Sequence, residues 1–119
     1  MVALTISVNG EKSETKIIKK MHERVIKTFL DTIVMAQLRS GPISGYDVIS
    51  FIQNKFGILV SSGTIYSLLY SLERNGLVEG VWYERKRIYR LTEKGARTIE
   101  IVLGAQDKIK SLLSVVFKA

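Results

Sequence analysis

Cysteine is absent from this 119-residue sequence, and histidine occurs only once, as His22. Without cysteine the chain has no disulfide, no thiolate nucleophile and no cysteine-ligated zinc. His22 lies in a charged stretch and cannot form a metal site alone. The pair Ser61-Ser62 has no base partner that the sequence reveals, and the carboxylates do not cluster. We therefore expect no metal, no cofactor and no enzymatic activity.

Long apolar runs are also missing, because no stretch approaches the ~18 residues that a membrane span needs. The first residues lack the basic segment of a secretory signal. These features predict a soluble, cytoplasmic protein with no membrane partner. Proline occurs once, glycine nine times, and 46% of the residues are hydrophobic, which is typical of a globular chain. A chain this short forms a modest core and can depend on a partner subunit.

Acidic residues are outnumbered, with 11 Asp and Glu against 18 Lys and Arg and a net charge of +7. A basic domain of this size favours a polyanionic partner, either nucleic acid or an anionic membrane surface. The alternative interpretation is a basic protein whose charge serves solubility only.

The stretch from Ser61 to Gly76 predicts one helix with both ends marked. Ser61 is suited to the N-cap, and Gly76 to the left-handed position just after the last turn. One face carries aliphatic side chains: Ile65, Leu68, Leu69 and Leu72. The other face has no acid: Gly63, Tyr66, Ser67, Tyr70 and Arg74. Such a face suits a groove lined by phosphates and base edges, although a solvated, serine-rich helix would look similar.

A shorter helix is predicted just before this one. Ser44 with Asp47 three residues later resembles a capping box, and the helix runs to Phe56, where Gly57 ends it. Residues 58–60 connect it to Ser61. Two helices joined so briefly are typical of a helix-turn-helix.

The segment that precedes the helix-turn-helix contains a core helix from about Ile17 to Leu38, ended by Ser40-Gly41-Pro42. Residues 2–8 alternate between apolar and polar types, which predicts a strand, and Asn9-Gly10 is a hairpin turn signal. Residues 11–16 would then return as a polar strand or form a solvated linker. The expected organisation is an N-terminal strand or hairpin extension (1–16), a winged helix-turn-helix domain (17–91) and a C-terminal helix (92–119).

After Gly76 the apolar period changes to two, which predicts a hairpin, or wing. Its strands are Leu77–Tyr83 and Arg87–Leu91, and Glu84-Arg85-Lys86 forms a tight turn. Four cations occupy the tip and the outgoing strand: Arg85, Lys86, Arg87 and Arg90. Beside a recognition helix they favour contacts with phosphates, although such a charge run alone would indicate a solvated hairpin end.

The last helix, from Thr92 to about Lys118, is apolar around more than half of its circumference. A helix lying on one domain needs an apolar stripe of only about 100°. A second copy of the same helix is the simplest cover, because two-fold dimers are the commonest oligomers. A lipid-surface helix is the weaker alternative, because its polar strip would be broad and basic. The predicted dimerisation residues are Ile101, Ala105, Ile109, Leu112, Leu113 and Val116.

Three motifs, found in this order, resemble PadR-type transcriptional regulators over residues 24–118. They are Gly41–Asp47, the run Ser61–Tyr66 with Leu69, Leu72-Glu73 and Gly76-Leu77-Val78, and Arg87–Gly95. The resemblance implies a winged-helix homodimer, usually a repressor, joined through its last helix. It places Ser61, Ser62, Gly63, Thr64 and Tyr66 near DNA, and it implies that Tyr46 touches the DNA backbone or buttresses the helix.

The sequence departs from the family pattern in two places. Ser62 stands where the family often has proline, which the first helical position tolerates. The wing is short and lacks a glycine-rich tip, which argues against deep minor-groove contacts. Members with one short C-terminal helix can bind flat aromatic drugs through a tryptophan on that helix. The only tryptophan here is Trp82, on the wing, where we expect it to pack within the core or the hairpin.

The predicted fold is mainly α (α+β), a winged helix-turn-helix with a two-stranded wing and a long C-terminal dimerisation helix. The predicted function is a sequence-specific DNA-binding transcriptional regulator, a homodimeric repressor on a palindromic operator. The residues predicted to contact double-stranded DNA are Tyr46, Ser61, Ser62, Gly63, Thr64, Tyr66, Ser67, Tyr70, Arg74, Arg85, Lys86 and Arg87. The alternative is a winged-helix protein-interaction module with Tyr66, Tyr70 and Trp82 as anchors. A small-molecule effector would leave no recognisable sequence pattern.

Overall fold

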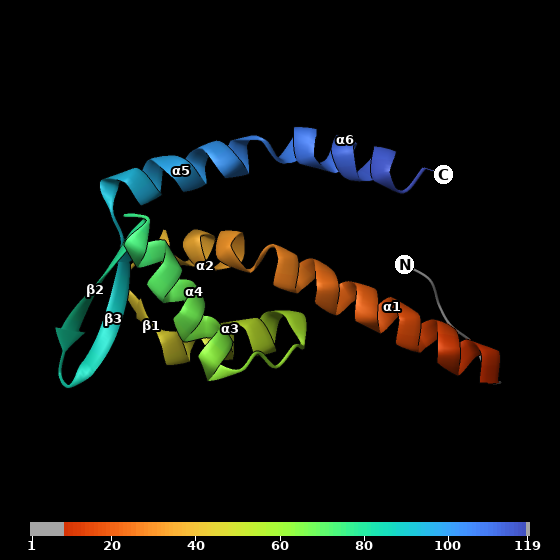
Figure 1. Ribbon diagram of the computed structural model, residues 1–119, viewed down its shortest axis with the longest axis horizontal. Helices are drawn as coiled ribbons and strands as arrows, with labels where there is room; N and C mark the ends of the chain where they lie inside the picture. The colour runs from red at the N-terminus through yellow and green to blue at the C-terminus, as the bar shows by residue number, and fades with distance from the viewer. Residues whose placement is uncertain (1–8, 119) are drawn as a thin grey trace. The chain divides into compact units, whose positions relative to one another are not determined.

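The computed structural model describes residues 9–118, which fall into two compact units divided between Leu30 and Asp31 (Figure 1). The first unit holds helix α1, Asn9–Thr28. Four large apolar side chains of α1 are exposed: Ile17, Ile18, Met21 and Val25. None of the described helices combines the length and apolar character that crossing a membrane requires.

Helix α1 corrects the prediction for the N-terminal region. The hairpin turn at Asn9-Gly10 and the polar strand or linker at 11–16 are wrong, because these residues form the first turns of the helix. The stretch 11–16 is rich in Glu and Lys, whose unbranched side chains lose little rotamer freedom in a helix. The strand predicted for residues 2–8 lies outside the described residues.

The prediction of one core helix over 17–38 is also wrong. The structure has two helices there, α1 and α2 (Leu30–Leu38), separated at Phe29. The amide of Phe29 still donates to the carbonyl of Val25 at 3.1 Å, so the interruption is local.

The second unit is the winged helix-turn-helix that the sequence predicts. After α2 come β1 (Ile43–Ser44), α3 (Gly45–Phe56) and α4 (Ser62–Arg74). The wing strands β2 (Val78–Tyr83) and β3 (Lys86–Leu91) follow, and the antiparallel sheet has the order β1-β3-β2. Tyr89 of β3 pairs with Ile43 on one side and Gly80 on the other. The two-residue strand β1 is too short to have been recognised by periodicity.

The core of this unit joins the helices to the sheet. Its fully buried side chains are Val34, Val48, Ile52, Ile65, Leu69, Val78 and Ile99. The apolar face predicted for α4 is confirmed, since Ile65, Leu69 and Leu72 are buried and Leu68 is half-buried.

The caps predicted around α3 and α4 are present. The Ser44 hydroxyl accepts from the Asp47 amide at 3.1 Å, and the Asp47 carboxylate accepts from the Ser44 amide at 3.2 Å. Gly57 ends α3 in the left-handed region at φ 69°. Gly76 does the same after α4 at φ 72°, and the Leu77 amide donates to the Leu72 carbonyl at 2.9 Å. This last pair of features is a Schellman motif.

The wing turn is shorter than predicted. Only Glu84 and Arg85 connect the strands, with φ values of 46° and 68°, and Lys86 already pairs with Tyr83. Two left-handed residues match the twist of a two-residue hairpin, a place where Asn-Gly is the usual choice.

The C-terminal helix is interrupted, in contrast to the single helix predicted from Thr92. Helix α5 (Glu93–Gly104) and helix α6 (Gln106–Val116) are separated at Ala105. Gly104, with its low helix propensity, directly precedes the break. The Ile109 amide still reaches the Ala105 carbonyl at 3.0 Å, so the helical path continues across it. Every residue of α6 is exposed.

Candidate nucleic-acid interface

The N-terminus of α4 presents small polar residues to solvent. Ser61, Ser62, Gly63 and Thr64 are all exposed. Ser61 caps the helix by accepting from the Thr64 amide at 3.2 Å, and the two hydroxyls lie 2.9 Å apart. The first amides of a helix carry partial positive charge, so this end is electrostatically suited to a phosphate.

The predicted polar face of α4 is exposed along its length. Tyr70 is 62% exposed, and the Arg74 guanidinium lies 5.7 Å from its ring centroid, within cation–π distance. Ser67, between the two tyrosines, is exposed as well. These side chains are accessible to a groove of nucleic acid. The opposite face of the same helix is buried in the core, which fixes the helix in place.

Tyr66 has a second role that the sequence did not indicate. Its ring lies against Gly45, where an added Cβ would come within 2.6 Å of the ring carbons. Gly45 is the first residue of α3, so this contact fixes the starts of α3 and α4 together. Tyr46, the next residue, is exposed beside this contact. Tyr46 and Tyr66, two of the residues predicted to contact DNA, are therefore both exposed, and the residue before Tyr46 packs against the Tyr66 ring.

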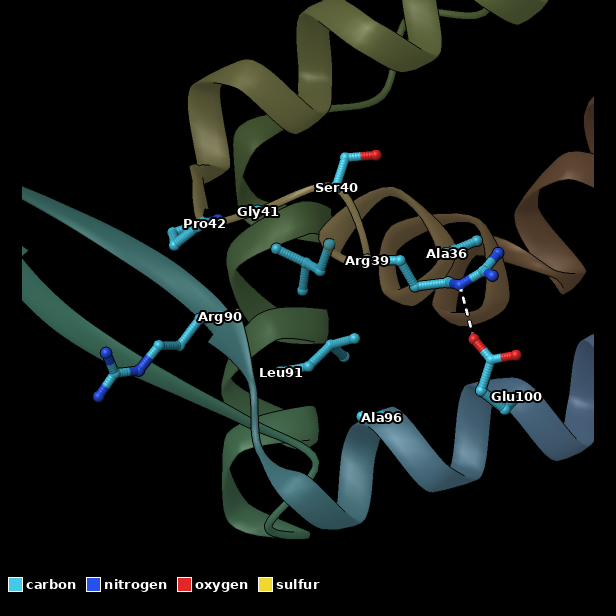
Figure 2. A pocket seen from close by; sticks show the side chains of 10 residues that line it. Ala36, Arg39, Ser40, Gly41, Pro42, Arg90, Leu91, Ala96 and Glu100 are labelled. Carbon is cyan, nitrogen blue, oxygen red and sulfur yellow. Dashed lines mark ion pairs between the residues drawn. The ribbon is translucent and has the colours of Figure 1, made fainter.

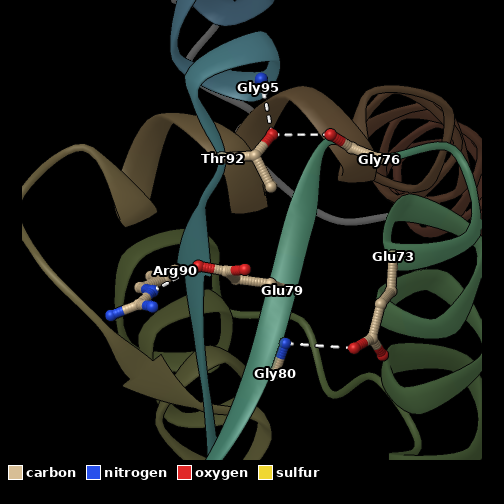
Figure 3. Close-up of polar contacts among 7 residues, drawn as sticks. All are labelled: Glu73, Gly76, Glu79, Gly80, Arg90, Thr92 and Gly95. Carbon is tan, nitrogen blue, oxygen red and sulfur yellow. Dashed lines mark hydrogen bonds and ion pairs between the residues drawn. The ribbon is translucent and has the colours of Figure 1, made fainter.

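Arg87 connects the wing to α4. Its Nη2 lies 2.8 Å from Glu73 Oε2, and the Gly80 amide donates to the same oxygen at 3.1 Å (Figure 3 shows the latter bond). The guanidinium also lies 5.7 Å from the centroid of the Tyr89 ring. The hydrogen bond to Glu73 raises the pKa of Arg87 above its ordinary value. Arg87, expected to contact phosphate, thus has its charge offset by Glu73, an acidic partner fourteen residues away.

The other wing cations divide into two kinds. Arg90 is paired with Glu79 at 2.6 Å, on the strand beside it (Figure 3). Arg85 and Lys86 are exposed at the tip and form no ion pair within residues 9–118. The tip therefore holds the two wing charges most available to an anion.

The capped start of α3 carries one perturbed carboxyl. Hydrogen bonds from the Ser44 hydroxyl and amide, with a smaller attraction from Lys86, hold the pKa of Asp47 below its ordinary value. Asp47 remains ionised in all but acidic solution and stabilises the first turn of α3.

A joint of hydrogen bonds ties the end of α4 to the start of α5 (Figure 3). The Thr92 hydroxyl donates to the Gly76 carbonyl at 2.5 Å, and the Thr92 amide donates to Leu77 at 3.1 Å. Lys94 Nζ donates to the Asn75 carbonyl at 3.0 Å. A Cβ at Gly95 would overlap the Leu77 carbonyl, so only glycine fits there. Three consecutive carbonyls after α4 are satisfied by the first turn of α5, which fixes α4 relative to α5.

A separate hollow of about 750 Å³ lies between α2, residues 39–42, the end of β3 and α5 (Figure 2). Arg39 and Glu100 form an ion pair of 2.8 Å across its rim. This hollow contains none of the residues predicted to contact DNA. Among the described residues no group of His, Cys, Asp and Glu is arranged to hold a metal ion.

The predicted dimerisation residues lie on α5, at the break and on α6. Ile101, Leu112 and Val116 are 73%, 59% and 64% exposed, and Ile109 and Leu113 are 38% exposed. Ala105, at the break, is half-buried. Apart from Ala105, these apolar groups are left exposed by the part of the chain that the structure describes.

Comparison with known proteins agrees with the winged helix-turn-helix fold of the structure. A family model described as "Transcriptional regulator PadR-like family" matches residues 34–101. Comparison with curated proteins gave no match.

Solved structures give the same result. A PadR family transcriptional regulator from Eggerthella lenta is 23% identical, with a TM-score of 0.75 over 91% of this chain and 98% of that one. A transcriptional regulator from Clostridium thermocellum is 26% identical, with a TM-score of 0.70 over 80% of this chain and 96% of that one. Bacillus subtilis PadR in complex with operator DNA is 26% identical, with a TM-score of 0.55 over 62% of this chain and 45% of that one.

Proposed function

Because this chain belongs to the PadR-like family of transcriptional regulators, we propose that it is a cytoplasmic, homodimeric repressor that binds a palindromic DNA operator. The observation that carries the proposal is the exposed, acid-free face of α4 in the same unit as a cationic wing tip. In Figure 1 the N-terminus of α4 and the turn of the wing lie on the same side of this unit, opposite α5. The Bacillus subtilis relative, solved with operator DNA, supports the choice of ligand.

In this proposal α4 enters the major groove of the DNA, and the wing lies over the neighbouring sugar–phosphate backbone. Ser62, Ser67 and Tyr70 then meet base edges or phosphates, a role supported by the exposure of all three residues on α4. Arg85 and Lys86 contact phosphates. Arg87 contributes mainly by holding the wing against α4 through Glu73.

The second copy of the chain covers the exposed apolar side of α5 and α6. Two-fold pairing would set two α4 helices on half-sites about one helical turn, ~34 Å, apart or a multiple of that distance. Both the area left uncovered on α6 and the absence of any buried residue in that helix favour such pairing.

The direct test is selection of bound duplexes from a random pool, with the mass of the complex measured in parallel. We expect an inverted repeat bound by two chains. Recovery of unrelated sequences, or of a single half-site bound by one chain, would contradict the proposal.

A charge test assigns the wing. The double substitution Arg85→Ala and Lys86→Ala should weaken binding to all duplexes about equally. The slope of log affinity against log salt concentration should fall in magnitude by about 2, since each phosphate contact releases about one counterion. Lys108→Ala with Lys110→Ala removes the same charge from α6 and serves as the control. A loss confined to the operator, with an unchanged salt slope, would show that these residues read sequence instead.

A protein-interaction module is the second candidate, because the exposed Tyr70 and Trp82 could anchor a protein partner. Chromatography on duplex DNA at moderate salt separates the two candidates. A regulator is retained and prefers duplexes long enough for two half-sites, whereas an interaction module elutes early without a length preference.

A further inference from the structure

Trp82, the only tryptophan of the chain, is 71% exposed on the wing. The prediction that it packs within the core or hairpin is therefore wrong. In the β2–β3 register Trp82 is paired with Arg87, Gly80 with Tyr89, and Val78 with Leu91. Val78 and Tyr89 are buried, so the row Val78–Gly80–Trp82 begins on the face that packs on the core. Trp82 is the member of this row that extends beyond the part of the sheet packed on α4.

The cross-strand partner does not cover the indole. The Arg87 guanidinium folds back over Gly80, where an added Cβ would lie 2.6 Å from Arg87 Nε, and it ends at Glu73 of α4. The nearest cations beyond Trp82 are Arg85 and Lys86 at the turn, both exposed. The exposed indole of Trp82 thus lies along the wing between the part packed on α4 and the two exposed cations of the turn, Arg85 and Lys86.

We propose that Trp82 contacts DNA by laying its indole on the deoxyribose edges beside the half-site, while Arg85 and Lys86 hold the adjacent phosphates. This inference rests on the proposed function, since it needs α4 in the neighbouring groove. The backbone of DNA offers apolar sugar carbons next to phosphate oxygens. An indole, with an apolar ring and one N–H donor, matches that combination.

The surrounding charge favours DNA over a protein partner for this side chain. A protein that covered Trp82 would also have to offset Arg85 and Lys86 with acidic groups, whereas the DNA backbone supplies phosphates at regular spacing. Contact with sugars carries no sequence information, so Trp82 should add equally to operator and non-operator binding.

Because the indole is uncharged, loss of Trp82 should affect DNA affinity and its salt dependence differently from loss of a cation. Trp82→Ala removes no phosphate contact, so affinity should fall while the slope of affinity against salt stays unchanged. Truncating an aromatic anchor at an interface is expected to weaken binding by about 5-fold or more. Trp82→Phe should retain most of the affinity. The comparison variant is Tyr83→Ala, which removes an exposed ring from the opposite face of β2, beside Lys86, and should cost clearly less affinity than Trp82→Ala.

Fluorescence of the wild-type protein tests the contact without any substitution, because Trp82 is the sole tryptophan. Duplex DNA should protect its emission from acrylamide, a neutral quencher, and inorganic polyphosphate should not. Thermal unfolding of each variant shows whether it folds, and an unfolded Trp82→Ala leaves the quenching result decisive.

Two failures are distinguishable. If wild-type protein binds duplex DNA, but acrylamide access is unchanged and Trp82→Ala binds as tightly as wild type, the role of Trp82 is overturned and the proposed function stands. If wild-type protein binds no duplex at low salt, the proposed function fails and this inference fails with it. Protection by polyphosphate equal to that by duplex would also overturn the inference, since charge alone would then explain it.

Discussion

Single residues at the ends of helices explain why the helix-turn-helix forms where it does. Ser44 and Asp47 satisfy each other's amides at the start of α3, and Gly57 and Gly76 take the left-handed conformations that end α3 and α4. Each of these contacts joins residues no more than a few positions apart. The helix ends are therefore specified locally, before any tertiary packing is considered.

The capping box yields a pH-dependent prediction. Asp47→Ala should lower the free energy of unfolding at pH 7 by roughly 0.5–1 kcal/mol, because the first turn of α3 loses an acceptor and a favourable charge. The pKa of Asp47 is lowered in the folded protein, so its contribution is fully present above the unfolded pKa, about 3.9. It is lost as the pH falls through the folded value.

Denaturant unfolding between pH 7 and pH 2.5 checks this expectation. The difference between wild type and Asp47→Ala should shrink below about pH 4. In a Ser44→Ala background the same substitution should cost less, since the partner hydroxyl is already gone. A difference that stays constant across the whole pH range would contradict the assigned role of the carboxylate.

At the scale of elements, two sets of contacts hold α4 in place. Glu73 binds the wing through Arg87 and Gly80, and the first turn of α5 binds the carbonyls that follow α4. Neither set is local, because each joins α4 to an element later in the chain. Together they hold α4 rigidly within the unit, so movement of α5 would carry α4 with it.

The joint at Thr92 can be tested by paired substitutions. Thr92→Val should lower the free energy of unfolding by about 1–2 kcal/mol, because the Gly76 carbonyl loses its donor and α5 loses its N-cap. Thr92→Ser keeps the hydroxyl and should be close to wild type. Thermal unfolding measures both variants, and equal losses for Val and Ser would show that the methyl group, not the hydroxyl, matters.

At the scale of the whole molecule, the apolar surface of α6 remains to be covered. Leu112 is 59% exposed near the middle of this helix, on the side proposed to meet a second chain. Leucine, valine and isoleucine side chains are exposed along this helix, and contiguous exposed apolar surface is typical of protein–protein interaction sites.

Leu112→Asp should therefore separate the proposed dimer, since burying a carboxylate against apolar side chains is costly. Sedimentation should give the mass of one chain, and operator affinity should fall by about tenfold or more, because the two half-sites are no longer joined. Ser111→Asp, in the polar strip of the same helix, is the control and should leave the dimer intact. A dimeric Leu112→Asp protein would place the interface elsewhere.

The sequence by itself determined the features that depend on neighbouring residues. These are the caps at Ser44 and Ser61, the turn at Gly76 and the apolar face of α4. Tertiary structure decided the rest. Arg87 meets Glu73 only because β3 folds beside α4, and Trp82 is exposed because its strand extends past the part packed on α4. Hydrogen bonds within one turn repeat with the helical period and can be recognised along the chain. Contacts between distant residues depend on how whole elements pack, and no periodic pattern in the sequence encodes that.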